Sequence, residues 1–292
     1  MGAANVIPGV SGGTIALITG IFERLINAIK SFDTTAVKLL LSGKIKDFLK
    51  HIDFNFLLAV GLGIAVSIIS IARLFDYLLV SYPVYIWSFF FGLILASVYY
   101  VGKQVGKWQL IQILSFIIGT AIAVSISVLS PASPNDSFLY LVVCGVVGAC
   151  SMILPGLSGS FVLILMGNYQ LVMIDAVNEM NLAVLLPVVL GAGIGLLAFS
   201  HILSWVFKRF RSQTLALLSG FILGSLLILW PWKDEVTETF GEKVKVVGYD
   251  WFLPSHFSTE VVLALVWAVV GILVIVGMEY MARFISKGES NQ

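Results

Sequence analysis

Charge is scarce in this chain of 292 residues: Asp, Glu, Lys and Arg make up 11% of it, whereas a soluble domain carries about a quarter. Apolar residues make up 59%, and the mean hydropathy is +1.02. This composition excludes an ordinary soluble domain and predicts a membrane protein. Because the formal net charge is only +1, there is no basic excess to bind a nucleic acid, and we expect no nucleic-acid partner.

Cysteine is scarce as well. Cys144 and Cys150 are the only two, and they share one apolar run, a spacing and setting that suit neither a metal site nor a disulfide framework. We interpret them as small packing residues and expect neither a metal nor a cofactor. The first residues show no basic region followed by a cleavable apolar segment, so no signal peptide is predicted.

Long apolar runs, by contrast, are abundant. Each is close to the roughly 20 residues that an α-helix needs to cross a hydrocarbon core of about 30 Å. The six runs are Asn55–Ala72, Val84–Val101, Leu110–Leu129, Leu182–Phe207, Leu215–Trp230 and Val261–Met278. They predict about six transmembrane helices in an all-α polytopic protein.

The sequence also repeats itself. MGAANVIPGVSGGTIALITG at the start returns 147 positions later as GACSMILPGLSGSFVLILMG, with Pro-Gly-x-Ser-Gly in both copies. Residues 57–100 align without a gap on residues 185–228, so that GLILAS is matched by GFILGS. The second motif has an apolar lead-in, residues 138–147, that the first lacks. An insertion of 19 residues between about Lys30 and Asp53 contains five lysines and predicts an amphipathic interfacial helix.

The distribution of Lys and Arg orients the two copies, because basic residues in short loops mark the cytoplasmic side. The segments expected inside are the lysine-rich insertion, the loop with Lys103 and Lys107, and the cluster Lys208, Arg209 and Arg211, while PASPND, Asp175–Asn181 and Trp232–Glu260 are expected outside. The loop after the first motif is then inside and the loop after the second outside, provided that each motif segment enters the membrane and returns on its own side. Two inverted-topology repeats, each with a Pro-Gly-broken re-entrant helix, are typical of transporters.

This interpretation divides the chain into four parts. They are residues 1–107, the first inverted repeat; 108–137, a connecting transmembrane helix and outer loop; 138–232, the second inverted repeat; and 233–292, an outer loop and C-terminal transmembrane helix.

A Pro-Gly break inside an apolar segment frees backbone groups, which membranes tolerate only where the groups are buried in protein or line a wet cavity. A helix that restarts after the break has unpaired N–H groups and the positive end of its dipole at the break, and these with the nearby hydroxyls predict a phosphate site. The residues expected to bind phosphate are Pro8, Gly9, Ser11, Gly12, Gly13, Thr14, Pro155, Gly156, Ser158, Gly159 and Ser160. The alternative is that the motif only kinks and packs helices.

Charged residues inside or beside apolar runs are the next candidates, since they are expensive there. Arg73 ends the first crossing run, and the gapless alignment places His201 at the same repeat position. Glu23 and Arg24 follow the first motif and are candidates for an ion pair with each other. We include all four as a possible charged path, against the alternative that Arg73 extends to the interface and His201 is a satisfied polar residue.

Several stretches resemble one bacterial family. NVIPGVSGGT, PGLSGSF, ARLFDYLLVSYP followed by FFFGLILAS, and SQTLALLSGFILGSLLILWPW are similar to the polyprenyl-phosphate translocases (PopT), over nearly the whole chain. The resemblance implies a multi-pass protein of the bacterial cytoplasmic membrane that returns undecaprenyl phosphate, the lipid carrier of cell-wall building blocks, from the outer to the inner leaflet. His201 departs from the basic residue expected there.

Two other functions remain open at this point. Gly156-Leu157-Ser158-Gly159 spells the Gly-x-Ser-Gly of a serine hydrolase, and His201 on a later helix completes a possible dyad. The same tetrapeptide occurs in the first copy, where the partner position holds Arg73, an unsuitable general base, so we expect no enzyme. A channel or transporter for a small anion is the stronger alternative, because helix N-termini also suit chloride.

Overall fold

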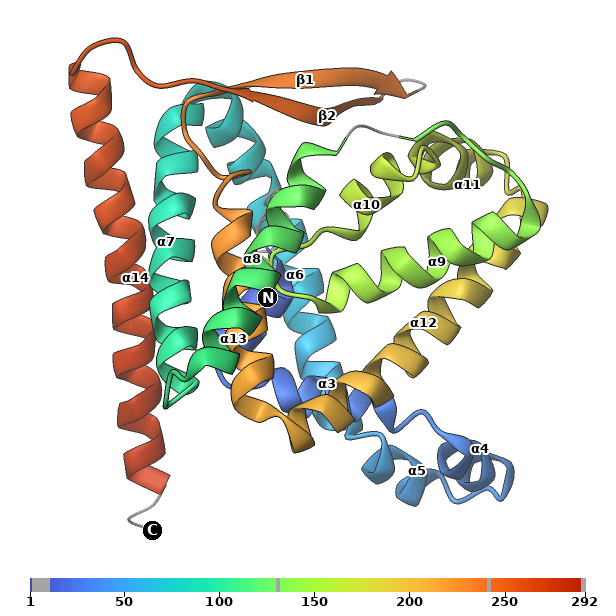
Figure 1. The fold of residues 1–292 in the computed structure, drawn as a ribbon. Coiled ribbons are helices and arrows are strands. Elements are labelled where there is room, and N and C mark those ends of the chain that lie inside the picture. Colours follow the sequence, from blue (N-terminus) through green and yellow to red (C-terminus); the bar gives the residue numbers. More distant parts are fainter. Residues whose placement is uncertain (2–10, 130–131, 241–242, 290–292) are drawn as a thin grey trace.

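The computed structural model describes residues 1, 11–129, 132–240 and 243–289 (Figure 1). Its helices in the first part of the chain are α2 (Gly12–Ile18), α3 (Phe22–Lys30), α4 (Thr34–Leu41), α5 (Ile45–His51), α6 (Phe54–Ser81), α7 (Pro83–Gln104) and α8 (Leu110–Val128). The second part contains α9 (Phe138–Ile153), α10 (Gly159–Leu165), the π-helix η1 (Leu171–Asp175), α11 (Ala176–Asn178), α12 (Leu182–Arg209), α13 (Arg211–Ser225), strands β1 (Lys233–Phe240) and β2 (Lys243–Trp251), and α14 (Thr259–Glu289).

Among the described residues, four helices are long and apolar enough to cross a membrane: α7, α8, α12 and α14. Two bent pairs, α2 with α3 and α5 with the first half of α6, raise the number to six if each pair is one crossing. We predicted a crossing over Leu215–Trp230, but α13 starts earlier and ends at Ser225, after which residues 226–229 form turns. The protein is thus mostly helical, with four to six candidate membrane spans.

Three helix pairs hold the bundle together: α7 with α14, α8 with α13, and α9 with α12. In each pair, a Cβ atom added to a glycine of either helix would overlap the backbone of its partner. These glycines are Gly92 and Gly271, Gly119 and Gly220, and Gly145 and Gly191. Small residues are how membrane helices come close enough to gain packing energy, since lipid supplies no hydrophobic force between them.

The repeat seen in the sequence is visible in the helices. α6 and α12 each have 28 residues, 128 positions apart, and each ends in a corner of nearly the same conformation, at Tyr82 (φ −140°, ψ 51°) and Phe210 (φ −134°, ψ 48°). In Figure 1, α6 runs upward from α5, whereas α12 runs downward from α11 toward α3. Gly63 of α6 is the counterpart of Gly191, yet no described atom lies within 4 Å of a Cβ placed there. At this position, no described residue packs on α6 as α9 packs on α12.

Two segments differ from the expectation. The lysine-rich insertion forms two short helices, α4 and α5, separated at Gly43 (φ 68°), instead of one amphipathic helix. The segment after Trp232, expected as a loop of an all-α protein, contains an antiparallel hairpin of β1 and β2. The hairpin lies across one end of the bundle (Figure 1), where Phe240 packs against Tyr169 with ring centroids 5.7 Å apart.

The connecting segments gather at two opposite ends. In Figure 1, α4, α5, the corner between α12 and α13, and the end of α14 lie at the lower end, while α11 and the hairpin lie at the upper end. The lower end carries the insertion lysines together with Lys208, Arg209 and Arg211. The basic insertion and the basic cluster, which the sequence predicted to share one side, therefore lie at the same end of the structure.

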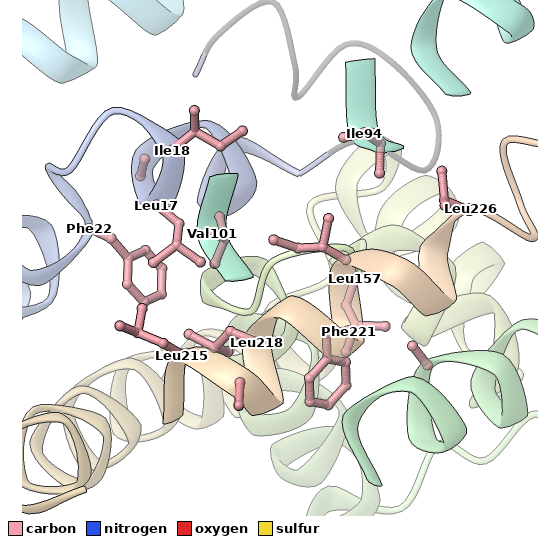
Figure 2. Packing of buried hydrophobic residues seen from close by; sticks show 14 of the residues in the cluster. Leu17, Ile18, Phe22, Ile94, Val101, Leu157, Leu215, Leu218, Phe221 and Leu226 are labelled. Carbon is pink, nitrogen blue, oxygen red and sulfur yellow. The ribbon is translucent and has the colours of Figure 1, made fainter. Parts of the chain in front are cut away.

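The main core lies between the first motif, α7 and α13. Its largest fully buried side chains include Phe22 of α3, Phe90 and Ile94 of α7, and Leu218 and Ile222 of α13. Figure 2 shows Leu17 and Phe22 packed beside Leu215 and Leu218 in this cluster. The first motif segment is thus anchored on the repeated GFILGS helix of the other half.

Candidate functional site

The second motif is a helical hairpin whose two arms begin and end at the same place. α9 leads into the Pro-Gly turn and α10 leads out of it. The backbone N–H of Ala132 donates to Leu165 O at 2.7 Å, and the Tyr140 hydroxyl donates to Met166 O at 2.8 Å. Asn168, which is fully buried, also forms two hydrogen bonds with the Asn135 backbone. These hydrogen bonds join the start of α9 to the end of α10, which is the geometry expected of a re-entrant segment.

The first motif also contains a short helix that ends in a sharp bend. α2 starts at Gly12, ends at Ile18, and is followed by α3 at an angle of 118°. Gly20 (φ 75°) lies at the bend and corresponds to Gly167 (φ 71°) after α10, so both copies use a left-handed glycine just after the C-cap of the short helix. Pro8 and Gly9, two of the residues expected to bind phosphate, lie outside the described residues.

The two motif turns touch. The Ser11 hydroxyl donates to the carbonyl of Leu154 at 3.3 Å, a contact between residues 143 positions apart. A Cβ atom at Gly13 would lie 2.6 Å from Ile153 O and 3.4 Å from Pro155 N, so this backbone approaches the second turn as closely as glycine allows. Figure 1 places the junction in the middle of the bundle, between the two ends that carry the loops.

α13 supports the second turn from the other side. Gly156 has φ 80°, and a Cβ there would lie 2.9 Å from Phe221 O and 3.1 Å from Ser225 Cβ. Leu157 is buried in the same cluster as Phe221 and Leu226 (Figure 2). The turn therefore has little room to move without α13.

The two turns are not equivalent in their hydroxyl groups. Ser11 is buried and caps α2, since its oxygen accepts from Gly13 N at 3.1 Å. Thr14 is also buried, with 1% of its surface exposed. In the second turn Ser158 makes no such cap, and its hydroxyl lies 3.0 Å from that of the exposed Ser160. The second turn therefore offers two open hydroxyls beside the first N–H groups of α10, whereas the first turn uses its serine for structure.

Glu23 and Arg24 do not form the ion pair with each other that the sequence suggested. Each pairs instead with a residue at the start of a different helix. Glu23 Oε1 lies 2.8 Å from Arg211 Nη1 at the start of α13. Arg24 forms two hydrogen bonds with Asp53 at the start of α6, at 2.6 and 3.0 Å, and its guanidinium lies 4.4 Å from the Phe56 ring centroid. The Arg24 contact lowers the pKa of Asp53. Together these exposed pairs join α3 to both repeats at the basic end.

His201 lies on the exposed side of α12, where its Nδ1 is 2.8 Å from Leu197 O of the same helix. Arg73 belongs to α6, but its side chain lies outside what the structure describes. No hydrogen bond joins Ser158 to His201 in the described part of the chain; Ser158 instead pairs with Ser160. The arrangement expected of a serine hydrolase dyad is not present.

Sequence reasoning missed one charged residue, Lys233 at the start of β1. Its ammonium donates to Ile228 O and lies over the rings of Trp87 and Tyr249, at 3.6 and 4.3 Å from their centroids. The clustered aromatic residues of WPWKD, just after a crossing run, were the available signal, but they were interpreted as part of an outer loop.

Residues 1–247 match the family model described as undecaprenyl phosphate translocase-like. The chain belongs to this family. It is also 40% identical to a Vibrio cholerae protein named polyprenyl-phosphate transporter, over 97% of this chain and 94% of that protein. A Staphylococcus aureus protein of the same name is 30% identical over 79% of this chain and 83% of the relative. No solved structure matches the chain.

Proposed function

We propose that this protein carries a polyprenyl phosphate of the undecaprenyl class from the outer to the inner leaflet of the bacterial cytoplasmic membrane, where it re-enters cell-wall polymer synthesis. The family and the names of both relatives support the substrate. The composition and the apolar helices support a place in the membrane.

The observation that carries the proposal is the contact between the two motif turns in the middle of the bundle. Ser11, just before α2, bonds to Leu154 in the second turn. α3, which follows α2, lies toward the lower end of the molecule in Figure 1, whereas α10 leads from the second turn toward the upper end. Inverted repeats whose broken helices meet near the midplane let one site be reached from either side in turn. The opposite directions of α6 and α12 in Figure 1 support this arrangement.

The second turn is the better candidate for the phosphate. Ser158 and Ser160 present hydroxyl donors. Gly159 lets α10 start close to α9, since a Cβ atom there would lie 2.7 Å from Met152 Cγ and 2.9 Å from Gly148 O. Hydrogen bonds to a charged group are worth about 1.5–3 kcal/mol, more than those between neutral groups. In this scheme Ser11, Gly12, Gly13 and Thr14 shape the site by holding the second turn in place.

The charges at the ends support a direction. Lys208, Arg209 and Arg211 lie exposed at the same end as α4 and α5, which the distribution of basic residues assigns to the cytoplasm. A phosphate released from the central turn toward this end passes from one positive environment to another. His201, about two helical turns before Lys208 and Arg209 on α12, is included in this inner path, and Arg73 is proposed for the opposite half of the route.

The test is transport by purified protein in liposomes, with a polyprenyl phosphate that carries a fluorophore quenched by an impermeant reagent outside. Wild-type protein should expose the inner-leaflet pool to quenching, and the double variant Ser158→Ala/Ser160→Ala should slow this by about tenfold or more. Ser42→Ala, in the exposed segment between α4 and α5, is the control. Equal rates in empty and protein-containing liposomes refute the proposal, and flux of chloride or inorganic phosphate without lipid transport would favour a small-anion transporter.

A further inference from the structure

An apolar groove of about 620 Å³ opens at the upper end of the bundle, where α13 stops short. Its walls come from α7, from the turns after α13, and from the chain that follows β2. The lining residues are Phe91, Leu223, Gly224, Leu226, Leu227, Trp230, Trp251, Phe252 and Leu253. None of them is charged, so a water-soluble anion gains nothing from this part of the molecule.

The groove is held in shape by its tryptophans. Trp230 Nε1 donates to Phe252 O at 3.0 Å, and Trp251 Nε1 donates to Leu227 O at 2.8 Å. Phe91 packs edge-on against Trp230, with centroids 5.8 Å apart. The outer rim is apolar and open, since Leu253 is 77% exposed. An exposed apolar rim next to a transmembrane bundle indicates an opening toward lipid.

Lys233 lies directly beside this groove. It pairs with Trp251 across the hairpin, and its ammonium rests on Trp87, which lies one helical turn before Phe91 on α7. No ion pair joins Lys233 to a carboxylate within the described residues. Burial lowers the pKa of Lys233 to about 7, although the negative charge of Glu235 opposes this shift.

A second polar group next to it is unsatisfied. Trp232 Nε1 is buried and has no hydrogen-bond partner in the described structure. Its ring contacts that of Trp230, a wall of the groove, with centroids 5.6 Å apart. A buried donor left unpaired is costly, and so is a desolvated cation. Lys233 and Trp232 each lie beside a tryptophan of the groove, Trp251 and Trp230, and each is a donor complementary to an anionic acceptor such as a phosphate.

The groove lies near the second Pro-Gly turn, on the other side of the last turn of α13. Gly224 and Leu226 line it, and the neighbouring Ser225 packs against Gly156 of the second Pro-Gly turn. A chain lying in the groove is thus separated from the proposed phosphate site by the last turn of α13.

We propose that the groove and its basic end form the loading site for the lipid at the outer side. The isoprenoid units nearest the headgroup lie along Phe91, Trp230 and Leu253, while the phosphate is bound by the Lys233 ammonium and the Trp232 N–H. This rests on the proposed function, since it assigns a second position to the same substrate, before the phosphate reaches Ser158 and Ser160. A phosphate headgroup without an isoprenoid chain would contact only Lys233 and Trp232 and would leave the groove empty.

The test measures equilibrium binding of a fluorescent polyprenyl phosphate to the protein in nanodiscs. Lys233→Met keeps the length of the side chain and removes the charge, and it should weaken binding about tenfold or more without lowering the melting temperature, because it removes a buried cation. Lys233→Arg should retain most of the affinity. Leu253→Glu adds a charge at an exposed rim position and should weaken lipid binding while leaving competition by inorganic phosphate unchanged. Lys107→Met, exposed at the opposite end, is the matched control.

The outcomes separate the two proposals. If wild-type protein transports and binds the lipid, but Lys233→Met and Leu253→Glu bind it as tightly as wild type, the loading site is refuted and the central site stands. If wild-type protein neither binds nor transports the lipid, the proposed function itself fails. Should Lys233→Met be poorly folded, Trp232→Phe, which removes only the N–H, and Leu253→Glu decide the question.

Discussion

Ser11 and Ser158 hold the same position in the two motifs but do different work, and this difference can be measured. Ser11→Ala removes a cap that accepts from Gly13 N at 3.1 Å and a donor that reaches Leu154 O at 3.3 Å. Loss of an N-cap costs about 1 kcal/mol, and loss of a buried hydrogen bond about another 1 kcal/mol. We therefore expect Ser11→Ala to lower the free energy of unfolding by about 2 kcal/mol.

Ser158→Ala should behave in the opposite way. Its hydroxyl makes no cap, and its contact with Ser160 Oγ at 3.0 Å is exposed, so the loss of stability should stay within about 0.5 kcal/mol. Its effect on transport should be the larger of the two once each variant is assayed well below its melting temperature, because it removes a proposed donor to the phosphate.

Thermal unfolding followed by tryptophan fluorescence, with both variants in the same detergent, gives the first comparison, and the liposome assay gives the second. The reasoning requires Ser11→Ala to melt lower than Ser158→Ala and to transport better when both are folded. Equal melting temperatures would show that the hydrogen bonds of Ser11 do not hold the turns together, and a reversed transport order would remove Ser158 from the site.

Two further predictions follow from the fold. In a cysteine-free background, cysteine at Gly43 should be shielded from an impermeant thiol reagent in intact cells and cysteine at Asn178 should be labelled; labelling of both from one side would contradict the inverted arrangement. Gly191→Leu should sharply reduce the amount of folded protein, since the new side chain would overlap Val142 O of α9, while Gly63→Leu at the repeat-equivalent position should be tolerated. Protein yield and gel-filtration profile check this, and similar losses in both variants would argue against the packing asymmetry.

Local sequence signals predicted the repeated parts of the fold well. The gapless offset between the two halves matches the bounds of α6 and α12, because caps at equivalent positions end both helices. α6 nevertheless continues to Ser81, past the predicted apolar run that ended at Ala72. The broken helices of the motifs follow from Pro and Gly alone. The hairpin was missed because its charges suggested a solvated loop, although KVKVV alternates as a strand does.

The contacts between distant segments could not be predicted from the sequence. Glu23 pairs with Arg211 because the bend after α2 turns α3 toward α13, and nothing near either residue in the sequence indicates this. Lys233 is buried by Trp87, which lies far earlier in the chain. The sequence analysis likewise assigned Ser11 and Ser158 the same role. Only the packed structure shows that the Ser11 hydroxyl is hydrogen-bonded to the second turn.

Within the described part of the chain, α6 and α12 are packed to different degrees. Tilting α12 requires α9 to move with it, because Gly145 and Gly191 bring their backbones together over several turns. α6 has no such companion in the described structure and is held mainly at its ends, by α5, α3 and α7. Among the described residues, the second repeat is therefore the more closely packed half. A tilt of α12 would cost the contacts of two helices at once, whereas a tilt of α6 would cost mainly the contacts at its ends.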